Sequence, residues 1–419
     1  MTRVVVASDK FKGSLTSNQV AVALGEGVRR ICPDVTVDAV PVADGGDGTL
    51  AAAVAAGFEF VPVTASGPTG EPVRTGFARR RGSDGRGGVA VVELADVSGL
   101  VRLPGGRPAP MTATSRGTGE LIAAAIQSGC TQVILGIGGS ASTDGGAGLV
   151  RALGARLLDA NGTEVAEGGA ALAEVAALDV SAFRERLAGV EVIVACDVDN
   201  PLTGPTGAAA TYGPQKGASP TQVEQLDTAL AHWADLVAHE TPARGAARAA
   251  GTAGAARAGL RHVVGDAAAG ADLRHAAGAG AAGGVGFAVL ALLGARVRPG
   301  IELMLELVRF HEQLAGADLV VTGEGALDEQ TLHGKAVAGV AAAAGAAGVP
   351  VVAVCGTNRL DADRLRSAGI TAAYALTDLE PDVRRCIAEP IPLLRRLGER
   401  IAVDHLPRST MSATERGAV

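Results

Sequence analysis

The sequence predicts an α/β protein of two domains, the first discontinuous and built on a mainly parallel sheet. Strand-like and helix-like segments alternate over residues 1–60 and again after about residue 281, an order typical of parallel α/β layers. Between them, short strand-like runs joined by Gly-rich turns favour antiparallel pairing. We therefore expect a first domain of residues 1–60 plus 283–402, an inserted mixed-sheet domain of residues 61–282, and a disordered tail over 403–419.

The first elements follow from a β-branched run and a helical repeat. A buried strand is predicted for RVVVASD, and a helix for SNQVAVALGEGVRRI with Ser17 or Asn18 as its cap. The next strand lies in VTVDAVPVADGGDGT and runs into a Gly/Asp loop, and TLAAAVAAG forms the following helix.

The inserted domain is predicted to begin with three antiparallel strands, FVPVTA, PVRTGFARR and GVAVVEL. It continues with a helix over Gly119–Ser128, the strand QVILGIG, a helix after STDGG and the strand VEVIVACD. Residues 241–279 are rich in Ala, Gly and Arg without a clear period, which indicates a mobile excursion.

Beyond that excursion, βαβ alternation resumes and is expected to complete the N-terminal sheet. Helices are predicted near 283–294 and 302–315. The strands DLVVTGEG, VPVVAVCG and ITAAYALTD follow, with the helix KAVAGVAAAAGAAG after the first of them.

Composition narrows the class of protein. A net charge of −7 and a pI near 5.6 argue against general nucleic-acid binding. The start MTRVVVASDK has no apolar signal core, and no apolar run reaches membrane-spanning length. Five scattered cysteines without metal spacing are expected to be reduced, as in a cytoplasmic protein. The oligomeric state, monomer or homodimer, stays open.

Carboxylates on loops after strands are candidate metal ligands. Asp44 and Asp47 lie in ADGGDGT, and Glu324 lies in TGEGALDEQTLHGKA. Ligands of open α/β sheets gather outside the carboxyl ends of strands, and oxygen ligands on a loop suit Mg²⁺ shared with phosphates. The alternative for ADGGDGT is an ordinary tight turn.

The segment GIGGSASTDGGAG follows the strand QVIL and precedes a helix, so small residues and amides there suit an anion. Ser140, Ser142 and Asp144 add hydroxyls and a carboxylate. The same segment fits a loose dinucleotide fingerprint, with Asp159 at a suitable distance. A polar helix cap is the simpler alternative.

Three further motifs carry candidate residues. Asp197 and Asn200 lie in ACDVDNPLTG after a strand, and Lys216 lies in the Gly/Pro loop ATYGPQKGAS. Gly283 lies in GAGAAGGVG, which suits either phosphate binding or close helix packing. Lys335 lies at a helix start, where its charge opposes the helix dipole and indicates an anion nearby.

Together these loops, lysines and carboxylates make up the inventory that phosphoryl transfer requires. The sequence contains no GxxxxGK[ST], HExxH, CxxC or GxSxG motif. Its motifs SDKFKGSLT, PVADGGDGT, GIGGSASTDGGAG, CDVDNPLTG, YGPQKGAS, GAGAAGG and TGEGALDEQTLHGK resemble, in this order, those of the type-1 glycerate kinases. The resemblance runs from residue 3 to about 385.

The resemblance implies ATP-dependent phosphorylation of D-glycerate, usually at the 2-hydroxyl to give 2-phosphoglycerate, and for some members 3-phosphoglycerate. It also implies two α/β domains, one flavodoxin-like, with the active site in the cleft between them. ATP and Mg²⁺ are then the expected cofactors.

Roles for the candidate residues follow from residue type and loop position. Lys12 and Lys335 would neutralise phosphate and carboxylate charge, and Asp197 would orient the glycerate hydroxyl as the base. The metal candidates are Asp44, Asp47 and Glu324, and the binding candidates are Ser140, Ser142, Asp144, Asn200, Lys216 and Gly283. The sequence does not separate ATP contacts from glycerate contacts.

Two other function classes remain compatible with the sequence. An NAD-dependent hydroxy-acid dehydrogenase would use the fingerprint at 136–141, although no His with a placed carboxylate stands out as a hydride-transfer partner. A non-catalytic sensor of a small acid would bind glycerate without turnover.

The two N-terminal lysines, Lys10 and Lys12, are two of only four lysines in the chain. The related kinases often carry Ser at the position of Lys10, whereas Lys12 matches their motif. We expect Lys12→Ala to lose far more turnover than Lys10→Ala in a steady-state kinase assay. Equal losses of turnover in the two variants would contradict a specific catalytic role for Lys12.

Overall fold

The chain folds into two compact units, each built on its own sheet. The computed structural model describes residues 2–43, 45–82, 87–240, 272–332 and 336–407. The first unit consists of Met1–Asp44 and Ile301–Val419, and the second of Gly45–Gly300. The first unit is thus discontinuous in sequence, and the second is a continuous insertion.

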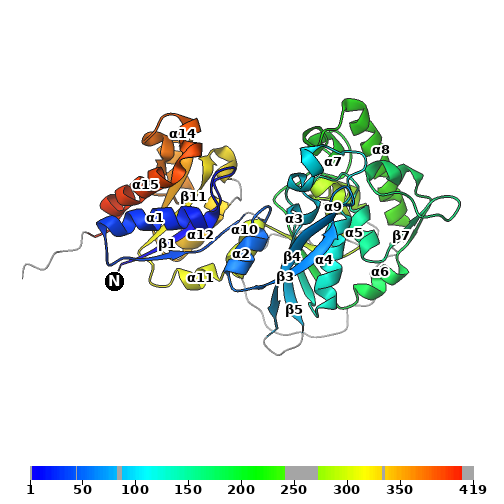
Figure 1. The fold of residues 1–419 in the computed structure, drawn as a ribbon, viewed down its shortest axis with the longest axis horizontal. Helices are drawn as coiled ribbons and strands as arrows, with labels where there is room; N and C mark the ends of the chain where they lie inside the picture. The colour runs from blue at the N-terminus through cyan, green and yellow to red at the C-terminus, as the bar shows by residue number, and fades with distance from the viewer. Residues whose placement is uncertain (1, 44, 83–86, 241–271, 333–335, 408–419) are drawn as a thin grey trace, which may run out of the picture. The chain divides into compact units, whose positions relative to one another are not determined.

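A five-stranded parallel sheet forms the centre of the first unit (Figure 1). Its Val-rich strands are buried, as expected for parallel strands covered by helices on both faces. In spatial order the strands are β13 (Ala372–Ala375), β12 (Val351–Asn358), β11 (Leu319–Leu327), β1 (Arg3–Ser8) and β2 (Thr36–Ala39). The helices are α1 (Ser17–Ile31), α10 (Gly300–Leu307), α11 (Phe310–Gln313), α12 (Ala336–Ala346), α13 (Ala362–Ser367), α14 (Val383–Ala388) and α15 (Pro390–His405).

Helices α1 and α15 lie side by side with their backbones in close contact (Figure 1). A Cβ atom on Gly27 would lie 2.0 Å from the carbonyl oxygen of Arg395, and one on Gly398 would lie 2.4 Å from that of Leu24. The absence of a side chain at both positions therefore sets the distance between the two helices.

The cap of α1 differs from the predicted one. Thr16, rather than Ser17 or Asn18, caps the helix, because its Oγ1 accepts a hydrogen bond from the N–H of Gln19 (3.3 Å). The Gln19 side chain accepts in return from the N–H of Thr16 (2.9 Å). This reciprocal capping box satisfies two amide donors at the start of the helix.

The C-terminal helix also ends later than predicted. Helix α15 continues through His405 instead of giving way to a tail at residue 403. Its end is held by the Tyr374 hydroxyl, which donates to Asp404 (2.9 Å) and contacts His405 Nε2 at 2.7 Å. The rest of the predicted tail, 408–419, lies outside the described residues, as do residues 241–271 of the predicted excursion.

A six-stranded mixed sheet forms the centre of the second unit. Strands β3, β4 and β5 pair antiparallel as predicted, and the pairs β5–β6, β6–β9 and β9–β10 are parallel. In spatial order the strands are β10 (Arg296–Arg298), β9 (Glu191–Ala195), β6 (Gln132–Gly136), β5 (Gly88–Glu93), β4 (Pro72–Arg81) and β3 (Glu59–Ser66), with a separate hairpin of β7 (Arg156–Leu158) and β8 (Ala177–Asp179). The predicted fold class is confirmed: a mainly parallel α/β unit with an inserted mixed α/β unit.

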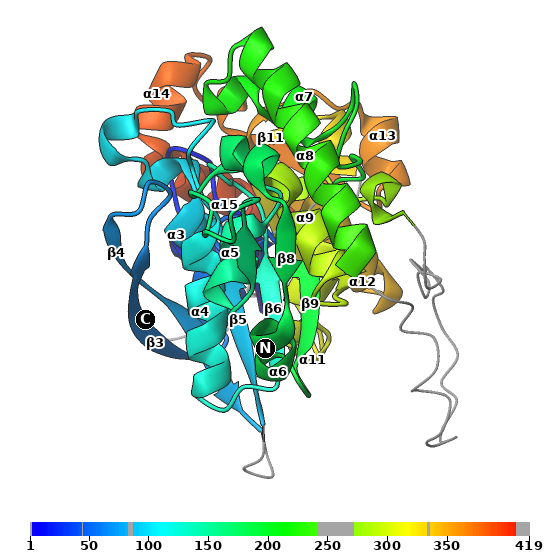
Figure 2. The ribbon, with the colours of Figure 1, turned by 90° about the vertical axis from the view of Figure 1, so that its right-hand side faces the viewer.

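Helices cover both faces of the mixed sheet. Helix α2 packs on β4 and β5 from the side opposite α4 (Figure 1), and Figure 2 shows α4 and α5 next to each other over β5 and β6. The helices of this unit are α2 (Thr49–Ala55), α3 (Ala95–Ser98), α4 (Arg116–Gln127), α5 (Ala147–Ala152), α6 (Ser181–Arg186), α7 (Ala208–Tyr212), α8 (Pro220–Glu240) and α9 (Ala281–Ala291). None of the helices in the described part of the chain is long and apolar enough to cross a membrane.

The boundaries between the units fall at 44/45 and 300/301, whereas the sequence predicted 60/61 and 282/283. The first boundary is earlier because α2 packs on the mixed sheet. The second is later because α9 and β10 belong to the second unit, where β10 pairs with β9. The loop after Asp44 and the GAGAAGG motif therefore belong to the same unit.

Two glycines in helices of the first unit provide a matched stability test. Alanine favours a helix interior over glycine by about 1 kcal/mol. A Cβ on Gly345 of α12 would meet nothing within 4 Å, so Gly345→Ala is expected to stabilise the protein by roughly 0.5–1 kcal/mol. Gly27→Ala is expected to destabilise it by about 1–3 kcal/mol, because its Cβ would overlap the Arg395 carbonyl. Urea unfolding of both variants measures these changes, and a stabilised Gly27→Ala variant would contradict the packing of α1 on α15.

Candidate active site

In the first unit, two of the predicted motifs end neighbouring parallel strands. Ser8 of β1 is in register with Gly323 of β11, and the N–H of Asp9 donates to the Gly323 carbonyl (2.8 Å). Glu324 follows Gly323 and is half-buried. SDKFKG and TGEG thus lie at the same carboxyl edge of the parallel sheet, where α/β proteins commonly bind ligands.

Lys12 lies in a tight turn between β1 and α1. Phe11 and Leu15 exchange backbone hydrogen bonds of 2.9 and 3.0 Å, and Gly13 closes the turn with a φ of 78°. A Cβ on Gly325 of β11 would lie 3.6 Å from the backbone nitrogen of Lys12. The turn therefore holds the exposed Lys12 beside the end of β11.

In the second unit, the loop of ADGGDGT packs against the end of β6. A Cβ on Gly136 would lie 2.6 Å from the carbonyl oxygen of Gly45, and one on Gly138 would lie 2.8 Å from the Cα of Gly46. The two backbones can approach this closely only because these positions lack side chains. The exposed Asp47 comes directly after this contact, so it lies at the carboxyl edge of the mixed sheet.

Asp197 lies at the end of the neighbouring strand β9. Its Oδ1 accepts a hydrogen bond from the N–H of Gly300 (2.9 Å), and the residue is exposed. A Cβ on Gly45 would lie 2.7 Å from the Cβ of Ala195 and 2.6 Å from the Cα of Gly300. The loop of Asp47 and the start of the Asp197 loop are therefore close together in the structure.

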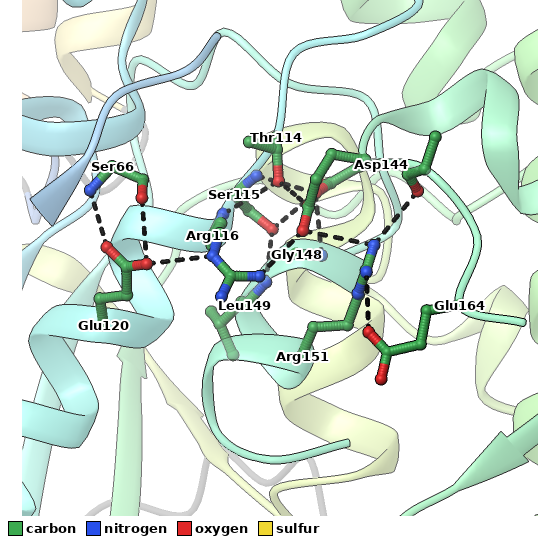
Figure 3. Close-up of polar contacts among 12 residues, drawn as sticks. Ser66, Thr114, Ser115, Arg116, Glu120, Asp144, Gly148, Leu149, Arg151 and Glu164 are labelled. Atoms are coloured by element: carbon green, nitrogen blue, oxygen red, sulfur yellow. Dashed lines mark hydrogen bonds and ion pairs between the residues drawn. The ribbon is translucent and has the colours of Figure 1, made fainter. Parts of the chain in front are cut away.

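The loop after β6 is anchored by the buried Asp144 (Figure 3). Its Oδ2 accepts from the backbone N–H and the hydroxyl of Ser115 (2.8 Å each) and from the N–H of Gly148 (3.1 Å), and its Oδ1 accepts from the N–H of Gly146 (3.2 Å). Burial raises the pKa of this carboxyl, and the hydrogen bonds from Ser115 and Gly148 act against that rise. Because both oxygens are engaged within the unit, we interpret Asp144 as a residue that shapes the loop.

Ion pairs surround this anchor at the start of α4 (Figure 3). Arg116 Nε lies 3.0 Å from Glu120, and Arg116 Nη1 lies 3.0 Å from Glu167. Glu120 also accepts from the backbone N–H of Ser66 (2.7 Å), at the end of β3. The pair with Glu167 and the hydrogen bond from Ser66 tie α4 to its neighbours, and each partly exposed ion pair contributes little free energy alone.

Lys216 is buried against the same loop, with 2% of its surface exposed. Its Nζ donates to the Ser142 carbonyl and to Ser140 Oγ (3.5 Å). A Cβ on Gly283, whose φ is 71°, would lie 2.9 Å from Nζ and 2.0 Å from the Ser142 carbonyl oxygen. Burial lowers the pKa of Lys216 to about 7, and the negative charge of Asp144 acts against this shift. The structure thus brings four predicted binding residues together.

Asn200 makes structural hydrogen bonds in the same unit. Its Oδ1 accepts from the Tyr212 hydroxyl (2.6 Å), and its Nδ2 donates to the Thr206 carbonyl (2.9 Å). Its own carbonyl accepts from the N–H of Gly280 (2.8 Å) at the entry to α9. Asn200 therefore connects the loop after β9 to the GAGAAGG motif.

The predicted metal ligands are described only in part. Asp44 and the catalytic candidate Lys335 lie outside the described residues; Asp47 belongs to the second unit and Glu324 to the first. Within the described ranges, no group of three or more His, Cys, Asp or Glu side chains could hold a metal ion. Mg²⁺ bound through substrate phosphates needs only one or two carboxylates, so an exposed Asp47 fits such a site.

Sequence reasoning missed two buried side chains that hold these loops. Trp233 of α8 donates from Nε1 to the carbonyl of Gly145 (3.0 Å). Glu93, the last residue of β5, accepts from the N–H groups of Gly48 (3.1 Å) and Leu50 (2.9 Å). The sequence contains a feature that points to each of them: Trp233 is the single tryptophan of the chain, and Glu93 ends the otherwise apolar strand GVAVVE.

Comparison with known proteins identifies the family. The family model described as glycerate kinase family matches residues 4–405, nearly the whole chain. The chain belongs to the glycerate kinase family. The family and the kinase class predicted from the sequence motifs are therefore confirmed.

Relatives of this glycerate kinase family member cover almost the same length. A protein named glycerate kinase from Bacillus subtilis (strain 168) is 42% identical over 89% of this chain and 90% of its own length. A protein named glycerate 2-kinase from Escherichia coli (strain K12) is 40% identical over 89% of this chain and 90% of its own length. A crystal structure assigned as glycerate kinase 2 of Salmonella typhimurium LT2 aligns with a TM-score of 0.76 at 39% identity, covering 96% of this chain and 98% of that one.

The lowered pKa of Lys216 predicts a pH-dependent stability. In the unfolded chain this lysine keeps its proton up to its usual pKa near 10.5, whereas in the folded protein it loses it near pH 7. Between these values the unfolded state binds more protons, so this group makes stability rise with pH, by at most about 1.4 kcal/mol per pH unit.

The measurement is urea unfolding of the wild type and Lys216→Met from pH 6 to pH 9. Titrating groups that do not interact with Lys216 are common to both proteins and cancel in the difference. We expect the difference in the free energy of unfolding, wild type minus variant, to rise with pH above pH 7 and to be independent of pH below about pH 6. A difference that stays constant up to pH 9 would contradict a buried lysine with a lowered pKa.

Proposed function

We propose that this protein is an ATP-dependent D-glycerate kinase that phosphorylates the 2-hydroxyl and releases 2-phosphoglycerate and ADP. The observation that carries the choice of the 2-hydroxyl is the E. coli relative named glycerate 2-kinase, with which the chain aligns over 89% of its length. The alternative product is 3-phosphoglycerate. The family match favours a kinase over an NAD-dependent dehydrogenase or a non-catalytic sensor.

The geometry suits phosphoryl transfer, in which catalysis consists mostly of positioning and charge stabilisation. The glycines at 136, 138 and 283 let the loops at the carboxyl edge of the mixed sheet pack directly against one another, which fixes the backbone of the candidate binding loops. We assign to Ser140 and Ser142 the binding of substrate or nucleotide beside this backbone. Lys216 holds their loop from within, since its Nζ donates to the Ser142 carbonyl.

Charged residues supply the remaining roles in the proposal. Lys12 is exposed on a tight turn and would neutralise developing phosphate charge, with Lys335 in the same role. Asp197 would accept the hydrogen bond of the glycerate hydroxyl as the base. The bond from the N–H of Gly300 fixes one oxygen of Asp197 and so limits rotation of its carboxylate.

We propose Mg²⁺ as the second cofactor beside ATP, with Asp44, Asp47 and Glu324 as candidate ligands. When bound, the ion would neutralise charge on the phosphates of ATP. The support for Asp47 is its exposure on a loop at the carboxyl ends of parallel strands.

We further propose a cytoplasmic location, with D-glycerate and ATP as the partners of the enzyme. All five cysteines are free, as expected in a reducing compartment. The net charge of −7 gives no support to nucleic-acid binding.

The test is a coupled ADP-release assay with ATP and Mg²⁺ across small hydroxy acids, followed by ³¹P NMR of the product. We expect ADP release with D-glycerate and a phosphorus signal coupled to the proton on carbon 2. Coupling to the protons on carbon 3 would instead establish 3-phosphoglycerate. Glycerate-dependent NADH formation without ADP, or glycerate binding without any turnover, would refute the kinase.

A further inference from the structure

Glu93 is a buried carboxylate that accepts hydrogen bonds from the loop of residues 46–50, which is distant in sequence. It ends β5, and only 5% of its surface is exposed. Its Oε1 accepts from the N–H of Gly48 (3.1 Å), and its Oε2 accepts from the N–H of Leu50 (2.9 Å). The two oxygens therefore hold two amides on either side of Thr49, which leaves the carboxylate a single orientation.

The same short loop is closed from within. The hydroxyl of Thr49 donates to the carbonyl of Gly46 (2.7 Å), and Gly48 adopts a φ of 100° that favours glycine. Asp47 lies between Gly46 and Gly48, and the backbone on both of its sides is held. Its position is thus set by Glu93 and Thr49.

Glu93 also connects this loop to the end of the next strand. It is in register with Gly136 of β6, and the N–H of the following residue, Leu94, donates to the Gly136 carbonyl (2.9 Å). Gly136 in turn contacts the backbone of Gly45. A cap from within the loop would satisfy the amides of α2 equally well, but it would not fix the loop to β5 and β6.

Burying the Glu93 carboxylate has an electrostatic cost. The pKa of Glu93 is raised to about 7, chiefly by burial and to a smaller extent by the nearby charges of Asp47 and Asp96, while the hydrogen bonds from Leu50 and Gly48 act against the rise. An apolar side chain at the end of β5 would avoid this cost. An apolar side chain would, however, leave the N–H groups of Gly48 and Leu50 without the two acceptor oxygens that Glu93 supplies.

We propose that Glu93 is a positioning residue that holds the loop of residues 46–50, so that the Asp47 carboxylate is presented to a divalent cation bound with nucleotide phosphates. The role of the cation rests on the proposed function, whereas the hold on the loop does not. Partners behind a metal ligand typically change metal affinity by about 10–100-fold when they are replaced.

The test compares Glu93→Gln, Glu93→Asp and the wild type. Glutamine keeps the size of the side chain but offers one acceptor oxygen, so an amide N–H faces an NH₂ group. Aspartate keeps both oxygens on a chain shorter by one methylene. We expect the amides of Gly48 and Leu50 to exchange hydrogen about 10-fold faster or more in Glu93→Gln, with an intermediate rate in Glu93→Asp, measured by NMR on the ligand-free protein.

The second measurement is Mn²⁺ binding in the presence of ADP, followed by water proton relaxation. Glu93→Gln is expected to lower the affinity for Mn²⁺ by about 10-fold or more in the wild-type background. In an Asp47→Asn background the same substitution is expected to lower that affinity by less than about twofold. Glu120→Gln is the matched control, because Glu120 also accepts from a backbone amide of this unit, that of Ser66, and contacts Arg116 rather than the 46–50 loop.

Unchanged exchange at Gly48 and Leu50 would overturn the proposal. So would an equal loss of Mn²⁺ affinity in both backgrounds, or the same loss in Glu120→Gln, because Glu93 would then act on stability alone. Neither measurement needs turnover. If the wild type releases no ADP with D-glycerate while both results hold, the proposed function fails and the positioning role stands.

Discussion

The second unit depends on direct backbone contact at the carboxyl ends of its parallel strands. Gly136 and Gly138 lie against Gly45 and Gly46 at distances where any Cβ atom would overlap main-chain atoms. Gly283 has the same relation to the Ser142 carbonyl. The places of Asp47, Ser140 and Lys216 follow from loops that can touch without side chains between them.

Loops built from such small residues cannot satisfy their own backbone groups, and buried N–H and C=O groups need partners. The structure provides these partners from outside the loops. Asp144 accepts from amides at the start of two helices, Lys216 donates to a loop carbonyl, and Trp233 donates to another. Glu93 does the same for the loop of Asp47. Charged and polar side chains are thus buried here because they supply the hydrogen-bond partners of the loop backbone, which the side chains of glycine and alanine cannot provide.

Much of the fold could be predicted from the sequence, because strand and helix patterns are local. The Val-rich β1, β11 and β12 and the antiparallel β3 to β5 lie where their patterns placed them. The unit boundaries could not be predicted, since α2 and α9 carry no local mark of the sheet on which they pack. For the same reason the pattern identified Asp144 and Lys216 as candidates but did not reveal that both side chains are turned inward and buried.

The strand order of the first unit has a consequence for the order in which the chain folds during synthesis. β1 and β2 emerge first, but the inner strand β1 pairs with β11, which begins at residue 319. The ribosome must therefore deliver the whole second unit before the Val-rich face and free edge of β1 find their partner. The inserted unit has all of its strands in one continuous stretch and can fold first. The N-terminal segment keeps an unpaired strand edge until β11 has been synthesised. During synthesis, residues 3–39 are thus the part of this protein whose unpaired strand edge is exposed to aggregation for the longest time.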